Sequence, residues 1–198
     1  FMVVLFAFLT PRFIQRLKAD FASIQREQRM RVESVVKNMM ERFVRDKAMD
    51  VAGQVEAYLL ASPGMTLDDL RRDPLFRKIA VQPVGKEGYT AVYDMEEGII
   101  YFHRYRQFEG LNFRRFAKEL PGFWRLIEVH LGGHYIGGYY KWRDPDGTVK
   151  DKYCYLVPLR VKTADGVSLG VGATVYLDEF IVPLRASQDI LHSAPYLM

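Results

Sequence analysis

The sequence is poor in the residues and motifs that mark the familiar classes of enzyme. Cysteine occurs once, as Cys154, so no disulfide can form within the chain. Its apolar, aromatic surroundings favour a small core residue over a nucleophile. With four histidines, the sequence has no phosphate-binding loop, nucleophile elbow, Cys-x-x-Cys pair or zinc-protease motif. We therefore predict no catalytic residue, no metal site and no cofactor.

The apolar run at the start of the sequence is too short to cross a membrane by itself. Residues 1–9 are apolar, whereas a spanning helix needs about 20 such residues. Two interpretations are open: residues 1–10 are the end of a transmembrane helix, or they form a short terminus that packs on the domain. We expect the first, because a basic stretch follows at once from Pro11 and Arg12.

Composition and charge indicate a globular protein with a charged helix near its start. The apolar fraction is 49% and the charged fraction 26%, which excludes a disordered chain. The net charge is +4, but many of the basic residues lie in the first quarter, interleaved with acidic ones. Mixed signs of this kind are typical of a solvated helix face, so we predict no binding to nucleic acid.

Residues 11–62 predict one long helix. Gly53 is the only glycine before Ser62-Pro63-Gly64, where the helix should end. Apolar residues recur at helical spacing, at Ile14, Leu17, Phe21 and Ile24 and then at Val32, Val35 or Val36, Met39 or Met40, and Phe43. A helix of roughly 45 residues would extend about 65–70 Å, which suits pairing with a second chain in a homodimer. Two shorter helices packed on one domain are the alternative.

Residues 63–182 predict an α+β domain. Thr66 should cap a short helix with Asp69 at its third position. We expect strands at 89–94 and 99–105 around a turn at 95–98, then helices at 113–120 and 123–129, with Pro121-Gly122 ending the first. Strands follow at 134–142, 152–161 and 168–177. This order predicts an antiparallel sheet with the long helix on one face and the segments from 102 to 134 on the other. Residues 183–198 should form a C-terminal linker.

Several short patterns then resemble one family. They run Val92-Tyr-Asp-x-x-x-Gly98 followed by His103, Gly110-x-Asn112, Tyr140-x-Trp142, Lys152-x-x-Tyr155, and Gly170 to Tyr176-Leu-Asp178. Together with the long helix, they resemble the Cache domains, the PAS-like extracytoplasmic sensor modules of bacterial receptors, over roughly residues 60–180. One departure is that Arg104 follows His103 where the family often has proline. The resemblance implies a PAS-like sheet and a ligand sensor, but no particular ligand.

Candidate ligand-binding residues come partly from this resemblance and partly from chemistry. The resemblance favours His103, Trp124, Tyr140, Trp142, Lys152 and Tyr155. An arginine or lysine on the same wall would pair with a carboxylate, which adds Arg106. Asp178 would either bind an amino group or cap a turn. These residues predict a pocket for a small organic anion, either a carboxylate or an amino acid, although core packing of the aromatic residues is the alternative.

The sequence as a whole therefore predicts a sensor domain of a transmembrane receptor. The domain itself would not be an enzyme; its output module, outside this sequence, would be a histidine kinase, a diguanylate cyclase or a chemoreceptor region. The resemblance implies a location at the cell inner membrane, with this domain periplasmic or extracellular. The alternative is a soluble α+β enzyme or binding module with an amphipathic N-terminal helix, in which His103 would act as acid or base with Asp94 or Asp178.

Overall fold

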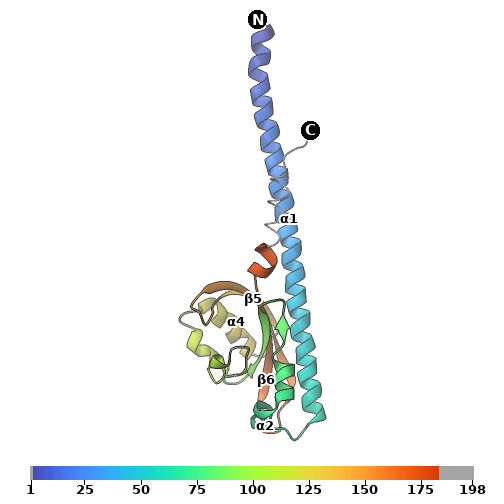
Figure 1. The fold of residues 1–198 in the computed structure, drawn as a ribbon, viewed down its shortest axis with the longest axis vertical. Helices are drawn as coiled ribbons and strands as arrows, with labels where there is room; N and C mark the ends of the chain where they lie inside the picture. The colour runs from blue at the N-terminus through green and yellow to red at the C-terminus, as the bar shows by residue number, and fades with distance from the viewer. Residues whose placement is uncertain (1, 183–198) are drawn as a thin grey trace. The chain divides into compact units, whose positions relative to one another are not determined.

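The computed structural model describes residues 2–182, with side chains from residue 13 onward. It divides the chain into two compact units, which meet between Asn38 and Met39. Helix α1 (Met2–Ala61) contributes to both units, and the strands and remaining helices belong to the second (Figure 1). The predicted linker, residues 183–198, lies outside the described residues.

The first unit is the amino-terminal part of α1. Its apolar residues recur at the spacing expected from the sequence, and their side chains are about half exposed or more: Phe13 64%, Ile14 49%, Leu17 52%, Phe21 53% and Ile24 52%. Helical side chains three and four positions apart lie on the same face, so these residues form an apolar stripe that remains open to solvent.

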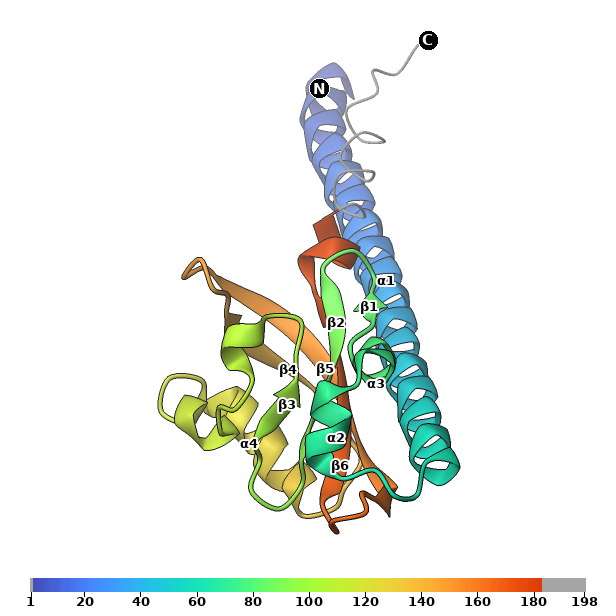
Figure 2. The same cartoon turned by 60° about the horizontal axis from the view of Figure 1, so that its bottom comes forward.

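The second unit is built on a six-stranded antiparallel sheet. Its strands are β1 (Pro83–Val84), β2 (Gly88–Asp94), β3 (Ile100–Phe102), β4 (Ile136–Arg143), β5 (Val149–Lys162) and β6 (Ser168–Tyr176). The order is β1-β2-β6-β5-β4, and β3 also pairs with β2 (Figure 2). The last strand of the chain therefore lies at the centre of the sheet, between β2 and β5.

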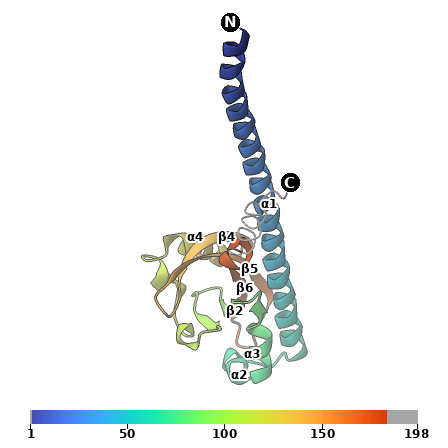
Figure 3. The same ribbon diagram turned by 45° about the horizontal axis from the view of Figure 1, so that its top comes forward.

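Each face of the sheet has its own hydrophobic core. On one face, Met40, Val44, Val51 and Val55 of α1 are buried against strand residues that include Val171, together with α2 (Leu67–Arg72) and α3 (Pro74–Ala80). The other face is covered by the short helices η1 (Arg106–Phe108) and η2 (Phe113–Phe116) and by α4 (Pro121–Leu131). Figure 3 shows α4 and α1 on opposite sides of the strands.

The expected α+β class is confirmed: an antiparallel sheet packs on a long N-terminal helix, with short helices and loops on its other face. The expected capping box is also present, since Thr66 accepts a hydrogen bond from the Asp69 N–H and the Asp69 side chain accepts one from the Thr66 N–H. Asp73 caps α3, which begins with Pro74.

Some expected boundaries are wrong. The strand expected at 99–105 ends at Phe102, because the His103 N–H bonds to the Glu109 carboxylate instead of to a neighbouring strand. Pro121 begins α4 instead of ending a helix, as proline needs no N–H partner in a first turn. The helix expected at 113–120 is only η2, and the two-residue strand β1 was not expected.

Candidate functional site

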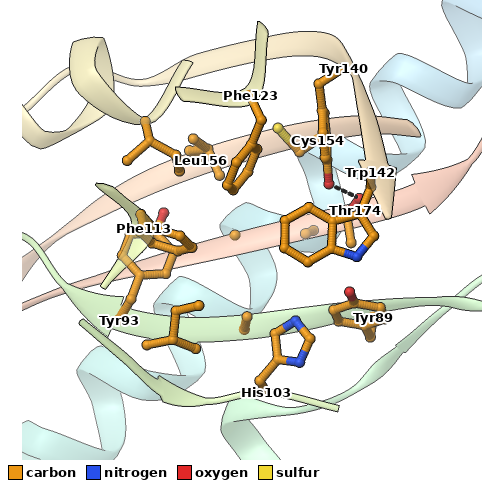
Figure 4. A pocket seen from close by; sticks show the side chains of 15 residues that line it. Tyr89, Tyr93, His103, Phe113, Phe123, Tyr140, Trp142, Cys154, Leu156 and Thr174 are labelled. Carbon is orange, nitrogen blue, oxygen red and sulfur yellow. Dashed lines mark hydrogen bonds between the residues drawn. The ribbon is translucent and has the colours of Figure 1, made fainter. Parts of the chain in front are cut away.

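A cavity lies between the sheet and the layer formed by η2 and α4. Its volume, taken as the space open to the centre of a water molecule, is about 50 Å³. That space holds a few waters or a ligand of a few non-hydrogen atoms, and it is far smaller than a pocket for a drug-sized molecule. Figure 4 shows the side chains around it, which are Tyr89, Ala91, Tyr93, Ile100, His103, Phe113, Phe123, Ile127, Tyr140, Trp142, Cys154, Leu156 and Thr174, beside the backbone of Gly172 and Ala173.

Strand alternation brings these side chains to one face of the sheet. Successive side chains on a strand point to opposite faces, so residues two apart share a face. On β2, Tyr89, Ala91 and Tyr93 face the cavity, while Val92 packs into the core beside α1. On the other strands the even-numbered positions face the cavity, as Tyr140, Trp142, Cys154, Leu156 and Thr174 do. The site is therefore a property of the sheet register and not of a single loop.

Aromatic rings form most of the cavity wall. Phe123 contacts three of them, with ring centres 5.6 Å from Phe113, 5.0 Å from Tyr140 and 5.2 Å from Trp142. Trp142 also packs against Phe108 at 5.4 Å and Phe116 at 5.3 Å. Most of these pairs are edge-on, which is the favourable arrangement for aromatic rings. Such interlocked rings form a rigid wall with few polar atoms.

Two polar atoms on this wall are buried and have no hydrogen-bond partner within residues 13–182. They are the Tyr93 hydroxyl and the Trp142 indole Nε1, which lie on opposite sides of the cavity (Figure 4). Tyr140, by contrast, is satisfied, since its hydroxyl lies 2.8 Å from the Thr174 hydroxyl. Leaving a buried polar group unpaired costs about 1–3 kcal/mol, so a ligand or water in the cavity that pairs with these atoms gains that energy.

His103 contributes a neutral imidazole to the cavity edge. Its Nδ1 lies 3.0 Å from the Tyr105 backbone nitrogen and 3.2 Å from the Tyr105 carbonyl oxygen, so it accepts from the first in one tautomer and donates to the second in the other. Burial lowers the pKa of His103 to about 3, so the ring is uncharged at neutral pH. The ring packs edge-on against Tyr89 with centres 4.7 Å apart. His103 is therefore suited to hydrogen bonding but not to pairing with an anion through charge.

Lys152 is a fully buried amine beside the cavity wall. Its Nζ bonds to the Tyr89 hydroxyl at 3.2 Å and lies over the rings of Tyr89 at 4.5 Å, Tyr176 at 4.2 Å and Trp142 at 5.7 Å. Among residues 13–182 it makes no ion pair within 4 Å. Burial lowers its pKa to about 7, opposed by the charge of Asp144. A buried amine without a carboxylate in contact is well placed to stabilise an incoming anion.

The structure brings together half of the residues predicted from the sequence. His103, Tyr140 and Trp142 line the cavity, and Lys152 lies directly behind Tyr89 and Trp142.

The other four predicted residues lie elsewhere. Tyr155 packs in the core on the α1 side of the sheet. Trp124 packs at the edge of the second core, with Arg114 over its ring at 5.7 Å. Arg106 lies in a separate cleft, and Asp178 is exposed just after β6.

The lining residues that sequence reasoning missed are Tyr89, Tyr93, Phe113, Phe123, Cys154, Leu156 and Thr174, beside smaller ones. Strand alternation was the available signal for several of them. Cys154 and Leu156 share a face with Lys152, and Tyr89 shares one with Tyr93. No comparable signal pointed to Phe113 and Phe123, because they come from short helices whose orientation depends on tertiary packing.

For the acid–base alternative, no carboxylate among the described residues bonds to the His103 ring. The groups that bond to its backbone and ring are Tyr105, Glu109 and Arg77. Asp94 instead accepts hydrogen bonds from the N–H groups of Glu96 and Glu97 in the turn after β2. In the part of the chain that the structure describes, no group of three or more His, Cys, Asp or Glu residues is arranged to hold a metal ion.

Comparison with known proteins gives similarity at the level of solved structures alone. No protein-family model matches the chain, and no curated protein does either. Among solved structures, it is similar to the PAS domain of an HTR-like protein from Haloarcula marismortui, with 11% identity, 46% of this chain and 88% of that chain covered, and a TM-score of 0.35.

Two further solved structures are similar over about half of this chain. One is the Drosophila melanogaster Cycle PAS-B domain with bound ethylene glycol, at 9% identity and a TM-score of 0.35. The match covers 44% of this chain and 98% of that one. The other is an RNA-binding light-oxygen-voltage receptor, at 17% identity and a TM-score of 0.38, with 54% of this chain and 34% of that one covered.

None of the helices within residues 2–182 has the length and apolarity needed to cross a bilayer.

Proposed function

We propose that this chain is a small-molecule sensor domain whose ligand binds in the cavity beneath η2 and α4. One observation carries the proposal: Trp142 Nε1 and Tyr93 Oη are buried on the cavity wall and have no partner among the residues that the structure describes. Unpaired buried polar groups are rare in folded proteins, and a bound molecule that accepts their hydrogen bonds explains both at once.

The polar groups around the cavity favour an anion. The Trp142 indole N–H can only donate a hydrogen bond, so it calls for an acceptor. Lys152 adds a buried amine behind the wall, and no lining residue is a carboxylate. The proposed ligand is a small carboxylate with a short apolar body. An amino acid is less favoured, because Asp178, the predicted partner for its amino group, lies outside the cavity.

Signal transfer would use the central strand of the sheet. The cavity-facing side of β6 carries Gly170, Gly172 and Thr174, while Val171, Ala173 and Val175 on its other side pack in the core that contains α1. A ligand that rests against β6 is therefore separated from that core by the thickness of one strand. Binding that favours one position of β6 would shift the balance between two arrangements of the core around α1.

The first unit supplies the proposed route to the membrane and to a partner. The apolar stripe at Phe13, Ile14, Leu17, Phe21 and Ile24 is exposed within one chain, as expected for a face that pairs with the same helix of a second copy. We propose a homodimer anchored at the inner membrane through residues 1–10, with the domain periplasmic or extracellular. The signal would pass to an output module such as a histidine kinase, a diguanylate cyclase or a chemoreceptor region.

Calorimetry with a panel of small carboxylates tests this function. Acetate, propionate, butyrate and pyruvate would be titrated into the wild type, Trp142→Phe and Trp124→Phe. Removing the Trp142 N–H keeps a ring in the wall but deletes a hydrogen bond to a charged group, so affinity should fall about tenfold. Trp124→Phe is the matched control, because Trp124 lies outside the cavity lining and should leave affinity unchanged. Equal affinities for all three proteins would contradict the proposal.

A further inference from the structure

A second, polar cleft lies beside α2, α3 and β3. The space in it that is open to the centre of a water molecule is about 250 Å³. Its lining contains four arginines: Arg71, Arg72, Arg77 and Arg106. The remaining lining residues are Asp68, Tyr101, Phe102 and Glu109. Four guanidinium groups against two carboxylates leave the lining with a net charge of +2. Elements that are separate in the sequence thus bring their positive charges to one concave surface.

Most of this positive charge is weakly paired. Arg71 lies 3.7 Å from Asp68, and Arg72 lies 3.6 Å from both Asp68 and Asp69; the two arginine side chains are more than half exposed. Exposed ion pairs at such distances contribute little. The Arg106 side chain has neither a hydrogen bond nor an ion pair among the described residues. Three guanidinium groups are therefore available to a ligand at little cost in lost interactions.

The fourth arginine connects the cleft to the cavity. Arg77 Nη2 bonds to Glu109 Oε1 at 2.8 Å and donates to the His103 carbonyl at 3.1 Å. The same Glu109 oxygen accepts a hydrogen bond from the His103 N–H at 2.9 Å. The Arg77–Glu109 pair thus holds both backbone polar groups of His103, whose ring lines the cavity. An anion that draws Arg77 away from Glu109 would loosen this hold.

We propose that this cleft is a second binding site, for a small dianion of the phosphate or dicarboxylate type, and that its occupancy is coupled to the cavity through His103. Guanidinium groups bind phosphate and carboxylate oxygens through paired hydrogen bonds, and two negative charges match the excess charge of the lining. This inference does not rest on the cavity being a sensor site. Because coupling is reciprocal, any cavity ligand would change the affinity of the cleft by the same factor.

Titration with inorganic phosphate and, separately, succinate tests the site. Binding to the full chain would be measured calorimetrically at low ionic strength and at a pH where phosphate is mostly dianionic, with sodium chloride as the ionic-strength control. Arg106→Gln should weaken binding about tenfold, because it removes a charge-assisted hydrogen bond. Arg125→Gln, an equal charge change on the exposed face of α4, should leave affinity unchanged. Tighter binding of phosphate or of succinate identifies which dianion the cleft prefers.

The backbone amide resonance of His103 gives a second readout. Occupancy of the cleft should shift that resonance in the wild type and should not shift it in Arg106→Gln at the same phosphate concentration. The proposal is overturned if neither dianion binds at millimolar concentration, or if Arg106→Gln and Arg125→Gln weaken binding equally. It is also overturned if binding leaves the His103 amide unmoved. Loss of binding in Trp142→Phe alone would assign the anion to the cavity instead.

Discussion

The buried amine of Lys152 should make the stability of this protein rise with pH. Its pKa is lowered from 10.5 to about 7 because burial disfavours the charged form. Between these two values the unfolded chain holds the proton and the folded protein has largely released it. The unfolded state therefore binds more protons, and the free energy of unfolding increases as pH rises through this range.

The expected size of this effect follows from the linkage between protonation and folding. A lysine with these two pKa values adds roughly 2 kcal/mol to the free energy of unfolding between about pH 7 and pH 9. His103 and His130, with pKa values lowered to about 3 and about 4, affect stability mainly below this pH range. The buried tyrosines, whose pKa values are raised above 10, act above it. Cys154, whose pKa burial raises from 9.0 to about 12, lowers the free energy of unfolding only slightly, near pH 9.

Urea unfolding at a series of pH values in this window measures the effect. Replacing Lys152 by methionine keeps the length and most of the volume of the side chain but removes the titrating group. Lys152→Met should therefore show a nearly flat dependence on pH where the wild type rises. Lys141→Met is the matched control, since Lys141 is exposed on β4 and pairs with Asp151 at the surface. A wild type that is flat, or a Lys152→Met protein that rises as steeply as the wild type, would refute this reasoning.

Other substitutions test the cavity, the backbone packing, a helix cap and the proposed dimer. Ala91→Leu should abolish carboxylate binding by filling the cavity floor, whereas Ala91→Ser should retain it, as followed by calorimetry. Gly88→Ala should lower the free energy of unfolding by about 1–3 kcal/mol, because the new Cβ would lie 2.2 Å from the Thr174 carbonyl oxygen. Gly53→Ala, where a Cβ meets open space, should stabilise α1 by up to about 1 kcal/mol; urea unfolding measures both effects. Thr66→Ala removes the capping box and should lower the free energy of unfolding by about 1 kcal/mol in the same assay. An unchanged urea midpoint would argue against the cap. Phe21→Glu should convert a dimer to a monomer in sedimentation, whereas Gln28→Glu should not; a monomeric wild type would contradict the proposed pairing.

Features set by local chemistry could be predicted from the sequence. The long helix, the Thr66 cap and the turn at Gly98 each depend on residues close together in the chain. Gly98 has φ of +72°, a left-handed conformation that favours glycine, which is why the turn between β2 and β3 could be expected there. The order of the alternating strand patterns and the helical segments then predicted the α+β class.

Two errors in the predicted site have different physical origins. Lys152 and Tyr155 are an odd number of positions apart on β5, so they must point to opposite faces of the sheet. The alternation of side chains along a strand therefore predicts that only one of these two residues can face the cavity. Arg106 could not be placed in that way, because β3 ends at Phe102 when the His103 N–H turns to Glu109, a contact that no local pattern reveals.

The cavity itself was the least predictable feature. Whether aromatic side chains fill a sheet face or leave a space depends on how Phe113 and Phe123 pack from the covering helices, and that is decided by tertiary structure. The predicted aromatic residues Tyr140 and Trp142 were consistent with either outcome.

A crystal structure of the protein grown with propionate would test the central claim most directly. The account predicts a carboxylate in the cavity, with an oxygen within hydrogen-bond distance of Trp142 Nε1 and the methyl end against Phe123 and Ile127. A cavity closed by the protein's own side chains, with no guest at saturating propionate, would contradict it.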